Sequence, residues 1–146
     1  MVERDGEADR RRIQGEAVIS EACKQALFKL AIDAGNIGDS LIRSFSGADQ
    51  ADSEAYFCER RVYIDVALGK DLEDSLTRED ARWRSYAKEQ VAKVAAAPKI
   101  RRGPSQGHSV IAHRWVDSEK FAGKMGHIRF MVRKTLAEHA AQEVTP

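Results

Sequence analysis

The sequence predicts an all-α protein, a single domain built as a bundle of about five helices with a basic Pro/Gly loop before its C-terminal helical region. Apolar residues recur at three- and four-residue steps along almost the whole chain, which is the spacing of one helix face. The pattern breaks at residues 98–108, which hold two prolines and two glycines. A chain of 146 residues has the usual length of one domain, so we assign residues 1–146 to one unit.

The N-terminal third predicts two helices after a charged start. Residues 1–10 are mostly charged and polar, and we expect them to be disordered. Residues 11–34 place apolar side chains such as Cys23 and Leu27 on one face, and Gly35 is expected to end that helix. Asp39 is then expected to cap a short helix that runs to Phe45.

The middle of the chain predicts two longer helices. The polar cluster at residues 49–53 is typical of a helix start, and the wide apolar stripe that follows it indicates a well-buried helix ending at Gly69. Thr77 followed by Asp80 resembles a capping box, which predicts a fourth helix from that point. Pro98 ends it, because proline disfavours helical geometry at the residue before it.

The C-terminal third predicts an exposed loop and a final helix. Residues 98–108 form the loop, and residues 109–116 suit either a short helix or a strand. Asp117 or Ser118 is expected to start the last helix. Its apolar residues fall within an arc of about 120° on a helical wheel: Phe121, Met125, Ile128, Val132, Leu136 and Ala140.

Several functional classes lack their signatures in this sequence. No apolar run reaches the ~20 residues that span a membrane, and the charged N-terminus lacks the apolar segment of a signal peptide, so we expect a cytoplasmic protein without membrane contact. Cys23 and Cys58 lie within apolar stripes and are expected to be buried thiols. The four histidines lack metal-site spacing, and no phosphate-binding glycine loop occurs. We therefore assign no catalytic residue, no metal and no cofactor.

Two aspartate pairs have a spacing that suits divalent ions. They are Asp49 with Asp52 and Asp71 with Asp74. Both pairs lie where helix starts are expected, and capping is the commoner role of aspartate there.

Charge is distributed unevenly along the chain. The formal net charge is only +1, yet residues 98–136 hold nine Lys or Arg against two acids, a local charge of +7. Residues 1–97 carry −4 and the remaining tail carries −2. Such a block is expected to attract a polyanion or an acidic protein surface.

We therefore predict that the C-terminal region binds nucleic acid, mainly through its phosphate backbone and with little sequence specificity. On the last helix, cations are expected on both flanks of the apolar arc, and Trp115 is a candidate for stacking on unpaired bases. The candidate residues are Lys99, Arg101, Arg102, Arg114, Trp115, Lys120, Lys124, His127, Arg129, Arg133 and Lys134.

The tetrad Gly123, Lys124, Met125 and Gly126 resembles the glycine-flanked loop with which KH domains clamp a nucleic-acid backbone. The likeness covers four residues, and the chain ends in a helical pattern where a KH domain has a further strand. Alternatively, Gly123 and Gly126 permit a close helix approach or mark the start of the helix.

Two segments have an arginine, five residues and then a histidine: Arg102 to His108, and Arg133 to His139. This spacing resembles the ribonuclease motif of HEPN proteins, which are small helical bundles. The resemblance implies an arginine that stabilises phosphate and a histidine that transfers a proton.

The leading hypothesis is a non-catalytic nucleic-acid-binding protein, either a small regulator or a subunit of a nucleoprotein assembly. One alternative is a protein-interaction module, an adaptor or inhibitor that covers an acidic or nucleic-acid-binding site on a partner. The other is an HEPN-like ribonuclease. The sequence leaves open whether DNA or RNA is bound and whether the chain forms a homo-oligomer.

Overall fold

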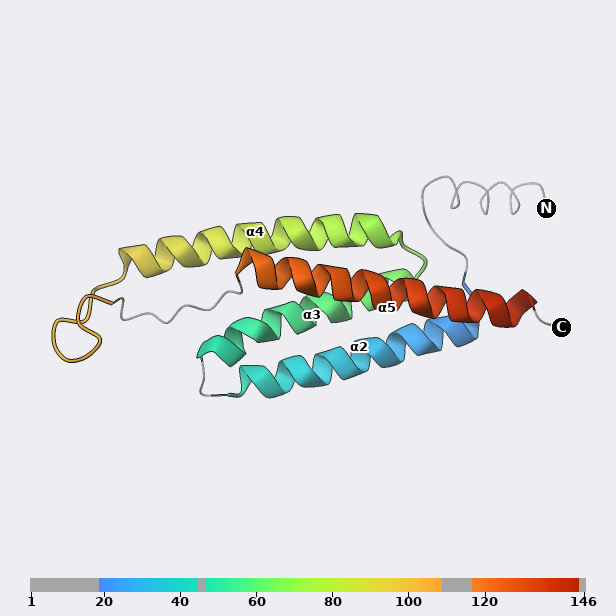
Figure 1. Cartoon of the computed structure of the whole chain (residues 1–146), viewed down its shortest axis with the longest axis horizontal. Coiled ribbons are helices and arrows are strands. Elements are labelled where there is room, and N and C mark those ends of the chain that lie inside the picture. The colour runs from blue at the N-terminus through green and yellow to red at the C-terminus, as the bar shows by residue number, and fades with distance from the viewer. Residues whose placement is uncertain (1–18, 45–46, 109–116, 145–146) are drawn as a thin grey trace.

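The computed structural model describes residues 19–44, 47–108 and 117–144, and these residues form four α-helices. The helices are α2 (Glu21–Ile42), α3 (Gly47–Ala67), α4 (Leu72–Ala96) and α5 (Ser118–Val144). Successive helices run in opposite directions along one long axis (Figure 1). The predicted all-α bundle is confirmed, with four helices in the described residues where about five were expected.

Helix α3 is the centre of the bundle. It contacts α2, α4 and α5, with the most extensive contact to α2, whereas α2 and α4 do not meet within the described residues. The core is formed by fully buried side chains such as Leu27 of α2, Val62 of α3, and Ile128 and Val132 of α5. These are the apolar stripes that the helical spacing predicted on α2, α3 and α5.

Helix α4 is attached mainly through its first half. Leu76 is its one apolar side chain in the buried core among the described residues, and Trp83 packs partly buried against that core. Farther along, Val91 is 51% exposed. The last turns of α4 extend past the adjacent ends of α3 and α5, so residues 98–108 lie beyond the bundle (Figure 1).

The prediction that Gly35 ends the first helix was wrong. Gly35, Gly38 and Asp39 all lie inside the continuous helix α2, so the separate helix expected from Asp39 to Phe45 does not form over the residues described there. Both glycines are buried against α3. A Cβ atom at Gly35 would lie 3.0 Å from Cδ of Arg60, and one at Gly38 would lie 2.7 Å from a ring carbon of Phe57. Glycine is therefore present because α3 approaches closely, and no turn is needed.

Polar side chains cap the helix starts, though not always those expected. The Ser20 hydroxyl accepts a hydrogen bond from the backbone N–H of Cys23, and α2 begins at Glu21. The part of the expected first helix at residues 11–18 lies outside the described residues. Asp71 caps α4 through the N–H of Asp74, whereas Thr77, the expected start, lies inside that helix and donates to the carbonyl of Glu73. The expectations for residues 1–10 and 109–116 lie outside the described residues.

The final helix starts as expected. Asp117 accepts a hydrogen bond from the N–H of Lys120 at 2.8 Å, and α5 begins at Ser118. Helix α3 ends at Ala67, close to Gly69, whose positive φ of 90° suits glycine. Helix α4 ends at Ala96, before Pro98.

None of the helices in the described part of the chain is both long and apolar enough to cross a membrane. The thiols of Cys23 and Cys58 are both buried, as their place in the apolar stripes predicted. Burial raises the pKa of the Cys58 thiol to about 12, and the nearby carboxylate of Glu79 adds to that rise.

Two glycine substitutions test the packing of α2 on α3. Gly38→Ala places a methyl group against the Phe57 ring, and we expect it to lower the free energy of unfolding by about 1–2 kcal/mol. Gly123→Ala adds a methyl group within α5 with no atom within 4 Å, so we expect a gain of about 0.5–1 kcal/mol. Urea unfolding of both variants checks the two signs, and equal effects at the two sites would contradict this account of the helix contact.

Candidate nucleic-acid interface

The cations of α5 lie on both flanks of its apolar face, as the helical wheel predicted, but these flanks border neighbouring helices. One flank lies beside α3 and the other beside the start of α4. Each flank meets carboxylates there: Lys120 pairs with Asp52, Lys124 and His127 with Glu59, and Arg129 and Arg133 with Glu73.

On the α3 side, Lys124 is held most tightly. Its Nζ lies 2.9 Å from Oε1 of Glu59 and 3.6 Å from the centroid of the Tyr56 ring. Its side chain is only 15% exposed, although binding to nucleic acid would require it to face solvent. The Nζ of Lys120 lies 2.8 Å from Asp52, and that hydrogen bond raises the pKa of the lysine.

On the α4 side, Arg129 makes a two-point contact with Glu73. Its Nε donates to Oε1 at 2.9 Å and its Nη2 donates to Oε2 at 3.1 Å. Arg133 donates to Oε1 of the same carboxylate at 3.3 Å. The Arg129 hydrogen bond, with the charges of both arginines, holds the pKa of Glu73 below its usual range.

The predicted basic surface is therefore divided. Five of its candidate residues face carboxylates contributed by α3 and α4, which lie outside the basic block in sequence. Each pair that involves a Lys or Arg lowers the field that a distant polyanion would meet. Arg114 and Trp115 lie outside the described residues.

The loop at residues 98–108 keeps its charges free. Lys99, Arg101 and Arg102 are exposed and have no ion-pair partner among the described residues, and the loop contains no acidic side chain. Its backbone is closed at the base, because the N–H of Ile100 donates to the carbonyl of His108 and the N–H of Gly107 donates to the carbonyl of Ile100, both at 2.8 Å. The cations thus project from a short closed loop beyond the end of α4.

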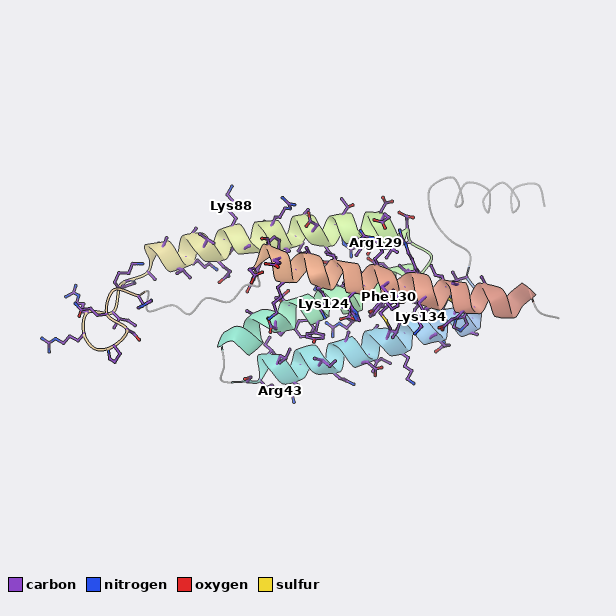
Figure 2. The ribbon with its side chains drawn as sticks, viewed as in Figure 1. Arg43, Lys88, Lys124, Arg129, Phe130 and Lys134 are labelled. Carbon is purple, nitrogen blue, oxygen red and sulfur yellow. The ribbon has the colours of Figure 1, made fainter. Side chains whose placement is uncertain are left out.

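Lys134 is the remaining cation of the candidate set. It is exposed on α5 and has no ion-pair partner within the part of the chain that the structure describes. It borders a shallow hollow lined by Gly126, Arg129, Phe130, Arg133 and Lys134. Figure 2 shows Phe130 and Lys134 as neighbours on this helix.

Phe130 lines the same hollow and was not among the predicted candidate residues. Its side chain is 62% exposed. The sequence itself indicates that this ring is exposed. At about 100° per residue, Phe130 lies on the opposite side of the helix from Phe121, outside the apolar arc.

A more enclosed cavity lies where α3, α4 and α5 meet. Its lining includes Cys58, Glu79 and the rings of Trp83 and Phe121, which stack with centroids 4.8 Å apart. Glu79 is 1% exposed, and both of its oxygens accept hydrogen bonds from Arg61, at 2.6 and 3.1 Å. The carboxylate is thus engaged in joining α4 to α3. No group of three His, Cys, Asp or Glu side chains in the described ranges is arranged to hold a metal ion.

The contribution of the Arg129–Glu73 contact to stability depends on pH. Because the pKa of Glu73 is lowered in the folded protein, its stabilising contribution is present above the unfolded pKa of about 4.3 and is lost as the pH falls through the folded value. Arg129→Gln is expected to raise the pKa of Glu73 toward that ordinary value, as measured by carbon NMR titration of the carboxyl group. Lys134→Gln is the matched control, and an equal rise there would contradict a specific pair.

Two of the segments that resemble known families, residues 123–126 and 133–139, lie within α5. The tetrad from Gly123 to Gly126 is internal to α5, so it forms neither a loop nor a helix start. A Cβ atom added at either of its glycines would meet nothing within 4 Å, so no close helix approach requires them. The Nδ1 of His139 lies 2.9 Å from the carbonyl oxygen of Thr135, while Arg133 contacts Glu73.

Comparisons with protein-family models, curated proteins and solved structures gave no significant match.

Proposed function

We propose that this is a non-catalytic nucleic-acid-binding protein that contacts the phosphate backbone through the loop at residues 98–108. The observation that carries the proposal is the set of three exposed cations, Lys99, Arg101 and Arg102, on a loop without acids. The loop extends beyond the bundle, where a long polyanion can approach it without meeting the helices (Figure 1).

Counterion release provides the driving force for such binding. Each phosphate that a Lys or Arg neutralises releases condensed cations, so affinity falls as salt rises, with a slope of about 0.7–0.9 per phosphate on a double-logarithmic plot. Three loop cations therefore support a slope of roughly 2–3. Contacts of this kind position a protein on the backbone without distinguishing bases.

The paired cations of α5 have a different role in this proposal. Lys120, Lys124 and Arg129 already contact carboxylate partners, and a phosphate would have to replace those partners to bind them. The loop cations need no such exchange. The contact surface is therefore smaller than the whole basic block, and we expect weak binding at physiological salt.

Two other functions use the same residues. An acidic protein surface would also be attracted to the loop, which is the adaptor hypothesis. Arg102 and His108 lie together in the exposed loop, and the ribonuclease hypothesis predicts that His108→Ala removes RNA cleavage. An RNA cleavage assay of the parent protein tests that prediction directly.

Charge reversal in the loop tests the proposal. Replacing Lys99, Arg101 and Arg102 with Glu is expected to weaken binding of a short DNA or RNA duplex at low salt by at least tenfold and to reduce the salt slope by roughly 2–3. Fluorescence anisotropy at several salt concentrations measures both quantities. Thermal unfolding is expected to change little, because these side chains are exposed and unpaired within the described residues.

A matched control has the same change in net charge. Lys29, Arg43 and Lys88 are exposed, lie on α2, at its end and on α4, and have no ion-pair partner in the described ranges; Figure 2 labels the last two. Their replacement with Glu is expected to have a much smaller effect on affinity. If the two triple variants behave alike, only net charge matters and the loop is not the site. If the parent protein binds no nucleic acid at low salt, the proposal fails and the adaptor hypothesis replaces it.

A further inference from the structure

The exposed ring of Phe130 lies in an unusual environment for a large apolar side chain. It is 62% exposed on α5, among charged neighbours and away from the core. Single exposed apolar residues are common on protein surfaces, so exposure alone does not indicate a site. The residues around the ring carry the inference.

The surface beside Phe130 is open because its neighbour one turn earlier is a glycine. Long side chains in a helix lean toward the N-terminus, over the residues three and four positions before them. For Phe130 the residue four positions before is Gly126, and an added Cβ atom at Gly126 would meet nothing within 4 Å. Phe130 and Gly126 thus line the same shallow hollow, and the site has room for a flat group beside the ring.

The rim of that hollow is positive. Lys134 is exposed and has no ion-pair partner in the described residues, while Arg133 is 64% exposed and uses one nitrogen, Nη2, for its contact with Glu73. Guanidinium has five N–H donors in all, so Arg133 retains donors for a second anion. No acidic residue lines the hollow.

We propose that Phe130 is a stacking platform for one base of a single-stranded nucleic acid, with Lys134 and Arg133 holding the adjacent phosphates. An aromatic ring beside a positive groove is the arrangement that binds unpaired bases, because every base has a flat face that stacks and every link carries a negative charge. A duplex hides those faces. This inference rests on the proposed function, and adds to it a preference for single strands and a second contact away from the loop.

The test separates stacking from phosphate contact by using two probes. One is a short oligothymidine, and the other is a strand of equal length whose sugars lack bases. Phe130→Ala is expected to weaken oligothymidine binding by roughly fivefold to a hundredfold at low salt, and to leave binding of the abasic strand unchanged. Phe130→Trp is expected to retain binding, because the larger ring also stacks.

A second variant tests the hollow without removing the ring. Gly126→Leu is expected to raise the helical stability of α5, because glycine is a poor helix former, and yet to weaken oligothymidine binding because the leucine fills the space beside Phe130. Val91→Ala, which removes an exposed apolar side chain from α4, is the control and is expected to have no effect.

The outcomes distinguish this inference from the proposal on which it rests. Equal oligothymidine affinity of the parent protein and Phe130→Ala overturns the stacking inference, and so does an equal loss for both probes. If loop charge reversal still abolishes binding in either case, the proposed function survives. If the parent protein binds neither the duplex nor the two strands at low salt, both fail together.

Discussion

The ion pairs that Asp52, Glu59 and Glu73 form with α5 determine which of its cations remain available to a ligand. These carboxylates come from α3 and α4, and they bind cations on the two flanks of α5 while its apolar face packs into the core. Glu59 is the strongest constraint, because it is 8% exposed and a buried carboxylate needs a partner. These pairs leave the loop and the Phe130 face as the surfaces of the described residues where cations remain available.

The same division leaves uncompensated positive charge at one place on a nearly neutral chain, as the proposed function requires. Exposed ion pairs add little to stability, so the pairs of Glu73 matter mainly because they reduce the local field. The loop beyond α4 has no carboxylate within reach among the described residues, and its charges are therefore not compensated. Structure, rather than the number of basic residues, selects which charges face a ligand.

Much of the fold could be predicted because its signals are local. The apolar stripe of α5, its capping by Asp117 and the end of α4 before Pro98 each depend on a few neighbouring residues. Gly35 misled the prediction because its role depends on Arg60 of another helix. The candidate site was harder for the same reason. The cations could be counted in the sequence, but Lys120, Lys124 and Arg129 find partners 68, 65 and 56 positions away. No local pattern shows such pairs.

The two glycines inside α2 also have a consequence for how the chain folds. Glycine weakens an isolated helix, and in proteins most of the stability of a helix comes from its tertiary packing. The stretch around Gly35 and Gly38 gains its packing only when Arg60 and Phe57 of α3 lie against it. Helix α2 is thus expected to be incomplete alone and to become regular together with α3, so that the antiparallel pair forms as one cooperative unit onto which α4 and α5 assemble.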